Sequence, residues 1–187
     1  MRKLLNKSIL SLTVVTLALL SFGVLAIAAT PEQPILVTSA GQSADDMILR
    51  VMLGRLFGEE VDREPMAAPA DLEGKKSLAL VVGVSNKGLG SAGINLDQEF
   101  ERIQTLLEAA KENDIHVFLL HIGGPSRRGA GSDQVAELVS AYAHHIIVTA
   151  ESNQDNYFDD LAEKNGAEVL VVETRNDAAI VMVDLFK

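Results

Sequence analysis

Short apolar runs alternate along the chain with longer segments whose apolar residues recur every three or four positions. The short runs are nearly continuous in aliphatic residues, which is typical of strands buried on both faces of a sheet. The longer segments have the period of amphipathic helices. The predicted strands cover residues 35–37, 66–68, 78–84, 117–122, 145–149 and 169–172. The predicted helices cover residues 44–56, 97–113, 133–143, 157–164 and 177–186.

Strands that alternate with helices indicate βαβ units, and therefore an α/β fold. We expect a doubly wound, mostly parallel sheet of five or six strands, flavodoxin-like or Rossmann-like, in a three-layer αβα arrangement. In open sheets of this kind, ligands bind beyond the carboxyl ends of the strands. The loops predicted there are small and polar, whereas opposite loops such as 111–114 and 163–166 look like solvated turns. The sequence therefore predicts a site on one edge.

The first 28 residues have the layout of a signal peptide. Arg2, Lys3 and Lys7 precede an apolar stretch over residues 9–20, and Ala26-Ile27-Ala28 matches the pattern of a cleavage site. We predict cleavage after Ala28 and export to the periplasm or the extracellular space, with residues 29–187 forming a single α/β domain. The alternative is an uncleaved anchor, because apolar character persists over nearly the roughly 20 residues that a membrane helix needs.

Charge and cysteine content narrow the classes of partner. The chain carries 16 Lys and Arg against 26 Asp and Glu, a net charge of -10. Removal of the signal peptide takes away three positive charges and leaves about -13. Such acidity argues against nucleic acid and against anionic membrane surfaces as partners. The chain contains no cysteine, which excludes disulfide bonds and a lipid anchor attached through cysteine.

A Gly-rich segment follows the predicted strand over residues 78–84. Gly88-Leu89-Gly90-Ser91-Ala92-Gly93 matches G-x-G-x-x-G, but three residues separate it from the strand, and the next strand does not end in a carboxylate. Both features argue against a dinucleotide fingerprint, and Lys87 stands before the glycines, unlike the lysine of a phosphate-binding P-loop. We interpret the segment as a nest of N–H groups with Lys87 as counter-charge. The alternative is that the glycines only permit turn dihedrals.

A second Gly-rich segment places Arg127 and Arg128 between Gly123-Gly124 and Gly129-Ala130-Gly131. Arginine offers a planar fork of donors for a carboxylate or phosphate. We expect one arginine to bind an anion and the other to be solvated or paired with an acidic neighbour. The alternative is two surface arginines that balance an acidic protein. Ser132 is the predicted N-cap of the helix that follows.

The loop after the first strand contains Ser39, Gln42 and Ser43. Ser43 is predicted to cap the next helix, with Asp46 completing an approximate capping box. Ser39 could act as a nucleophile only with a base nearby, so binding is favoured over catalysis here. His121, at the end of a predicted strand, is either a general base or ligand donor, or a buried histidine bonded to a loop carbonyl.

The remaining histidines do not predict a metal site. His144 and His145 are adjacent, so on a strand they would point to opposite faces and could not chelate together. His116 stands at a strand start, away from the expected site. The zinc motifs H-x-x-H and H-E-x-x-H do not occur, and no cofactor is predicted.

Three segments in this order resemble an uncharacterised family of exported bacterial proteins, catalogued as a domain of unknown function. They are residues 34–45, residues 87–94, and His121-Ile122-Gly123-Gly124 with Arg127-Arg128-Gly129 and Ser132-Asp133. The resemblance covers nearly the whole mature chain. It implies an exported α/β domain and carries over no activity or catalytic residue.

Taken together, the sequence predicts an exported domain that binds a small anionic or polar ligand at the carboxyl edge of the sheet, as an accessory to transport or sensing. A small hydrolase that uses Ser39 or His121 is one alternative. A module that docks a membrane transporter or envelope protein is the other. The predicted ligand-binding residues are Ser39, Gln42, Ser43, Ser85, Lys87, Gly88, Gly90, His121, Gly123, Gly124, Arg127, Arg128 and Asn153.

Overall fold

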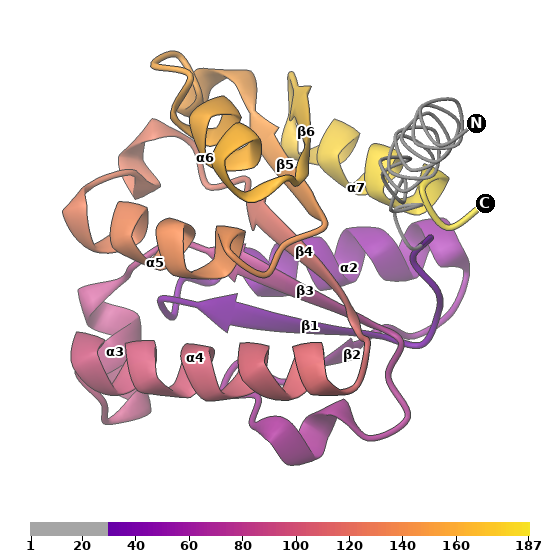
Figure 1. Cartoon of the computed structure of the whole chain (residues 1–187), viewed down its shortest axis with the longest axis horizontal. Helices are drawn as coiled ribbons and strands as arrows, with labels where there is room; N and C mark the ends of the chain where they lie inside the picture. The colour runs from indigo at the N-terminus through magenta and orange to yellow at the C-terminus, as the bar shows by residue number, and fades with distance from the viewer. Residues whose placement is uncertain (1–29) are drawn as a thin grey trace, which may run out of the picture.

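Six strands form one sheet in the computed structural model, which describes residues 30–187 (Figure 1). The sheet order is β2-β1-β3-β4-β5-β6, and every neighbouring pair is parallel. This order contains the flavodoxin-like sequence 2-1-3-4-5, so the predicted fold class is confirmed. The strands are β1 (Ile35–Ala40), β2 (Asp62–Arg63), β3 (Ser77–Val82), β4 (His116–His121), β5 (His145–Thr149) and β6 (Glu168–Val172).

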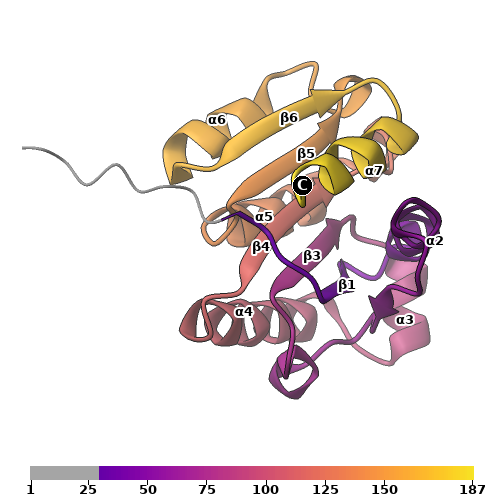
Figure 2. The same ribbon diagram turned by 90° about the vertical axis from the view of Figure 1, so that its right-hand side faces the viewer.

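The helices cover both faces of the sheet, as the three-layer prediction requires (Figures 1 and 2). Buried side chains of α2 and α7 pack on one face, and those of α4, α5 and α6 pack on the other. A short helix, α3, lies between β3 and α4 in the sequence. The helices are α2 (Asp45–Phe57), α3 (Asn86–Ala92), α4 (Leu96–Glu112), α5 (Ala130–Ser140), α6 (Tyr157–Asn165) and α7 (Arg175–Asp184).

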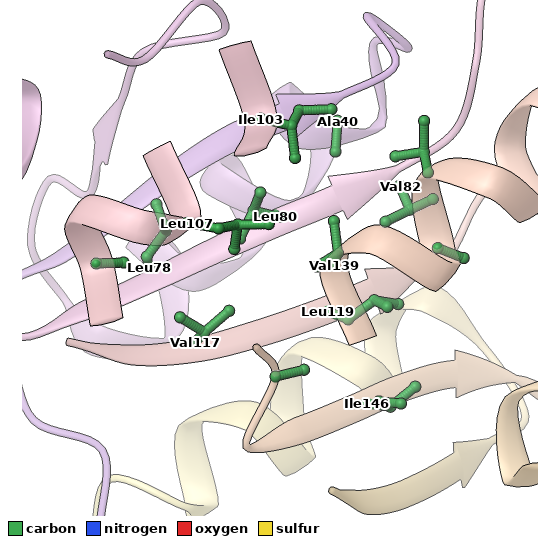
Figure 3. Packing of buried hydrophobic residues seen from close by; sticks show 14 of the residues in the cluster. Ala40, Leu78, Leu80, Val82, Ile103, Leu107, Val117, Leu119, Val139 and Ile146 are labelled. Atoms are coloured by element: carbon green, nitrogen blue, oxygen red, sulfur yellow. The ribbon is translucent and has the colours of Figure 1, made fainter. Parts of the chain in front are cut away.

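Alternation along the strands separates two cores. In β3, Leu78, Leu80 and Val82 belong to the core under α4 and α5, and Figure 3 shows them on the face of the sheet that Ile103 and Leu107 also cover. The intervening residues of β3 belong to the core under α2 and α7. Because successive side chains of a strand point to opposite faces, the same parity assigns every residue of β1 and β4 to a face.

The structure corrects the predicted bounds of one strand and one helix. No strand forms at residues 66–68; the edge strand is Asp62–Arg63, which pairs with Leu36 and Val37 of β1. Its two polar residues carry no apolar signal, which is why the pattern missed it. The helix predicted from residue 133 begins at Ala130 instead, so Ser132 lies inside α5 and is not its N-cap.

The predicted signal peptide lies outside the described residues. Across residues 30–187, none of the helices combines the length and the apolar character needed to cross a membrane. Cleavage and export therefore stay predictions.

Leu107→Ala should lower the free energy of unfolding by about 2–5 kcal/mol, because Leu107 is fully buried on α4 and its truncation leaves a cavity. Leu56→Ala is the matched control, since Leu56 on α2 is 47% exposed, and we expect a change within about 0.5 kcal/mol. Urea denaturation of both variants measures the difference. Equal losses would contradict this packing.

Candidate functional site

The loops after β1 and β3 meet where the sheet order reverses. Gly41 has φ 110°, and a Cβ there would lie 2.7 Å from the carbonyl oxygen of Gly83. The Ser85 N–H donates to the Gly41 carbonyl at 2.8 Å, and Gln42 and Val84 form an isolated bridge. The Val84 N–H also donates to Ser132 Oγ at 2.9 Å. Backbone contact thus fixes both loops at the switch point, where open α/β sheets bind ligands.

A buried carboxylate on α4 anchors the loop after β1. Glu99 Oε1 accepts hydrogen bonds from the Gly41 N–H at 2.8 Å and from Gln42 Nε2 at 3.1 Å. Arg102 holds both oxygens of the same carboxylate, each at 2.8 Å. The other donations of Arg102 reach the carbonyls of Ala67 and Ser39, at 2.9 and 2.6 Å. The pair therefore joins α4 to the end of β1 and to the segment after β2.

Sequence reasoning missed Glu99, although a signal for it exists. Glu99 falls four positions before Ile103, on the apolar face of α4, and its side chain is fully buried. A charged residue at a core position is nearly always paired, so this placement could have suggested a buried ion pair.

Gln42, a predicted ligand contact, is engaged within the protein. Its Nε2 donates to the Pro65 carbonyl at 3.1 Å as well as to Glu99. Its backbone has φ 61°, in the left-handed region, and the loop contacts hold it there. The amide nitrogen of Gln42 thus fastens the loop and offers no remaining donor to a ligand.

The first Gly-rich segment is a helix and not a loop. Ser85 caps α3, its Oγ accepting from the Gly88 N–H at 3.1 Å, and the Leu89 N–H donates to the Ser85 carbonyl. A Cβ on Gly88 would overlap the carbonyl oxygen of Gln42, so this glycine permits close packing of α3 on the β1 loop. Lys87 and Gly90 are exposed on the helix. The segment therefore belongs to a helix that the hydrophobic pattern did not predict, and Ser85 occupies the N–H groups of Gly88 and Leu89.

Arg128 is fully engaged by neighbouring groups. Its Nε contacts Asp133 at 2.7 Å, its Nη1 donates to the Ser152 carbonyl at 2.7 Å, and Asp155 receives two further bonds. Its guanidinium also lies 4.5 Å from the centre of the Tyr157 ring. The hydrogen bonds that Arg128 donates to the Asp133 carboxylate raise the pKa of Arg128, and the hydrogen bonds that it donates to Asp155 lower the pKa of that carboxyl. Arg128 is therefore the arginine paired with acidic neighbours.

Arg127 is the less engaged arginine. Its side chain is 36% exposed, and its one ion pair within residues 30–187 is long, 3.5 Å from Nε to Asp45 Oδ2. The chain of Arg127 crosses directly over Gly123, where a Cβ would overlap its Cγ. Ser43 and Arg127 both border Gly83, with Ser43 Oγ 3.1 Å from the position of a Cβ there. We call Ser43, Asp45, Gly83, Gly123 and Arg127 the switch-point cluster.

Asp45 was not among the predicted site residues. Its side chain is only 10% exposed, and its Oδ2 makes no hydrogen bond within the described part of the chain. The next residue, Asp46, is fully buried and pairs with Arg63 Nε at 2.7 Å. The capping box predicted for Ser43 and Asp46 is therefore wrong, because Asp46 turns toward Arg63. Asp45 and Asp46 lie in the first turn of α2, where the helix dipole favours carboxylates.

Ser39 and His121 do not form a nucleophile–base pair. Ser39 shares the parity of Ile35 and Val37, on the face under α2 and α7, and its Oγ donates to the Ser43 carbonyl at 3.2 Å. His121 lies on the opposite face, 5.2 Å from the ring of Phe158. A hydrolase reaction at this edge would need another pair.

His121 is completely buried, and neither ring nitrogen makes a hydrogen bond within residues 30–187. Burial lowers the pKa of its imidazole, because a charged ring would lose its hydration.

The other predicted positions have local roles or stand at the rim. Asn153 Oδ1 accepts from the Phe158 N–H at 2.9 Å and its amide donates to Asp159, so it orders the start of α6. Gly124 has φ 78° and lies close to the carboxylate of Glu151. Within residues 30–187, no three His, Asp or Glu side chains are arranged to hold a metal ion.

Comparisons with known proteins give one family. Residues 32–186 match a family model described as "Domain of unknown function (DUF6305)". No curated protein is significantly similar to the chain.

Two solved structures show distant likeness. A protein assigned to the lipolytic G-D-S-L family of Desulfitobacterium hafniense DCB-2 has 12% identity, a TM-score of 0.37, and 81% of this chain and 95% of its own covered. A GDSL-like lipase from Bacteroides thetaiotaomicron VPI-5482 has 13% identity, a TM-score of 0.37, and coverages of 76% and 71%. TM-scores this low support no statement about the function of this chain. The fold class is assigned from the order of the strands in the sheet.

Glu99→Gln keeps the shape of the side chain but leaves the Arg102 charge without its counter-ion. We expect the free energy of unfolding to fall by about 3–5 kcal/mol in chemical denaturation. Glu101→Gln, an exposed position on the same helix, is the control and should change stability by less than about 0.5 kcal/mol. Similar values for the two variants would show that the buried pair does not anchor the loop.

The buried imidazole of His121 predicts a loss of stability in mild acid. Because its pKa is lowered from 6.5, the unfolded chain binds a proton near that pH that the folded chain does not. The free energy of unfolding therefore falls below pH 6.5, by at most about 1.4 kcal/mol per pH unit for this group.

Urea titrations of the wild type and of His121→Leu, at about pH 7.5 and about pH 5.5, test this linkage. The variant should lose less stability on acidification than the wild type. It retains the contributions of His144 and His145, whose pKa values burial also lowers. The same acid-induced loss in both proteins would refute the assignment to His121.

Proposed function

The chain belongs to the family described as a domain of unknown function (DUF6305), and we propose that it binds a small anionic or polar ligand at the switch-point cluster. Arg127 would receive the anionic group of the ligand. Ser43 and the Gly123 backbone would border it, and Asp45 would accept a hydrogen bond from a neighbouring hydroxyl or amino group. The ligand class is therefore a small hydroxy- or amino-carboxylate, or a phosphate ester with a nearby hydroxyl.

The contrast between the two loop arginines carries this proposal. Arg128 has two carboxylates, a carbonyl and an aromatic face around it, whereas Arg127 has one long ion pair and a partly exposed guanidinium. A planar guanidinium with unused donors is suited to bidentate binding of a carboxylate or phosphate. Arg127 also stands at the switch point, where this class of sheet binds ligands.

The Oδ2 atom of Asp45, which accepts no hydrogen bond, supports the inclusion of a hydroxyl or amino group in the proposed ligand. A buried carboxylate oxygen without a hydrogen bond is costly, and a ligand donor would relieve that cost. The net charge of -10 gives anions no long-range attraction to the protein, so recognition would depend on short-range contacts in the cluster.

Export and an accessory role in transport or sensing belong to the same proposal. The basic residues, the apolar stretch and the Ala26-Ile27-Ala28 site support export. A small-ligand receptor outside the cytoplasm would hand its ligand to a membrane transporter or to another envelope protein.

Calorimetric titration of the full chain with phosphate, acetate and glycolate tests the binding proposal. Glycolate should bind more tightly than acetate, because its hydroxyl can donate to Asp45. Arg127→Ala should weaken glycolate binding about tenfold or more, as expected for loss of a charge-assisted bidentate contact. Arg175→Ala, an exposed arginine that begins α7 after β6, is the matched control and should leave binding unchanged.

Asp45→Asn separates the two contacts, because it should reduce the preference for glycolate over acetate while retaining anion binding. The proposal fails if none of the three anions binds. It also fails if Arg127→Ala and Arg175→Ala bind glycolate equally.

A further inference from the structure

Three histidines gather at the amino ends of the strands, opposite the switch-point cluster. His116 begins β4, His145 begins β5, and His144 immediately precedes it. His116 Nε2 and His145 Nδ1 share a hydrogen bond of 2.9 Å, and the ring of His144 stacks on that of His116 with centroids 4.4 Å apart. His144 and His145 therefore meet around His116, although they are adjacent in the sequence.

A cavity of about 290 Å³ opens beside His144. It lies between the ends of α4 and α5 and the start of β4. Its walls combine the apolar side chains of Ile115 and Val117 with the aromatic ring of Tyr142. Lys111 and Asp114 supply the charges at this site. This volume is near the lower end of those that hold small molecules.

Hydrogen bonding fixes the tautomer of His144. The Val117 N–H donates to its Nδ1 at 3.1 Å, so that nitrogen carries no proton and the neutral ring bears its proton on Nε2. Burial lowers the pKa of His144, which keeps this neutral form at pH 7. Stacking on His116 holds the plane of the ring.

The helices α4 and α5 both end beside the cavity, and backbone groups that follow them satisfy several of their last carbonyls. The Ile115 N–H bonds to Ala110, and the Asn113 N–H bonds to Ala109. Tyr142 and Ala143 likewise bond to Val139 and Ser140. Among the side chains that line the cavity, Lys111 and His144 offer hydrogen-bond donors, and Asp114 is the one carboxylate.

We propose that this cavity binds a small planar monocarboxylate with an aromatic or apolar body. The carboxylate would lie between Lys111 Nζ and His144 Nε2–H, and the body would pack on Ile115, Val117 and Tyr142. A single negative charge on the ligand would pair with the Lys111 ammonium group. The second charge of a dianion would be repelled by the Asp114 carboxylate. This site is separate from the switch-point cluster and does not depend on the function proposed there.

Titration of the full chain with benzoate, benzamide and benzylamine, which share a ring and differ in charge, tests the inference. Benzoate should bind and shift the ring-proton resonances of His144, benzamide should bind more weakly, and benzylamine should not bind. Lys111→Met and His144→Phe should each weaken benzoate binding about tenfold. His144→Gln should restore part of the loss, because its amide can replace the Nε2–H donor.

Two control variants make the result specific. Lys164→Met removes a lysine from the last turn of α6, away from the cavity, and should not change benzoate affinity. Arg127→Ala should also leave it unchanged, which separates this site from the switch-point cluster. Binding of benzylamine in place of benzoate would overturn the inference. So would benzoate binding that is lost in Arg127→Ala and retained in Lys111→Met.

Discussion

The geometry of the carboxyl edge of the sheet depends on one buried ion pair, that of Glu99 and Arg102. Removing these charges from water is costly, and the cost is offset only where every oxygen and donor finds a partner. Here the carboxylate accepts from the Gly41 N–H, from Gln42 and from the guanidinium, while Arg102 also reaches two carbonyls. These hydrogen bonds therefore fix the position of the loop after β1. The loops that pack on it are positioned by their contacts with it.

Close contacts at three glycines connect the loop after β1 to the other loops at this edge of the sheet. Gly41 touches Gly83, Gly88 touches Gln42, and Gly123 lies beneath Arg127. At each contact a Cβ would collide with an atom already in place, and Gly41 also has a φ of 110° that side-chain-bearing residues rarely adopt. Within residues 30–187, Arg127 and Asp45 are among the groups at this edge that keep unfilled hydrogen-bonding capacity.

Hydrophobic periodicity predicted most of the fold because β3, β4 and β5 are buried on both faces and read as continuous apolar runs. It failed for β2, whose two residues are polar, and for α3, where glycines hid a helix capped by Ser85. The site was harder to predict. The sequence predicted the edge and singled out both arginines, but which arginine is engaged depends on Asp133 and Asp155, which approach Arg128 only in three dimensions. The cluster of His116 with His144 and His145 depends in the same way on the pairing of β4 with β5.

The strand order also has a kinetic consequence. β1 is the first strand to leave the ribosome, yet it lies inside the sheet, and its long partner β3 follows about forty residues later. The residues that anchor its loop, Glu99 and Arg102, follow later still. Contacts between residues so distant in sequence require closure of long loops and form slowly. The loop after β1 can therefore take up its final position only after the chain as far as α4 is available, so we expect this edge of the sheet to be completed late in folding.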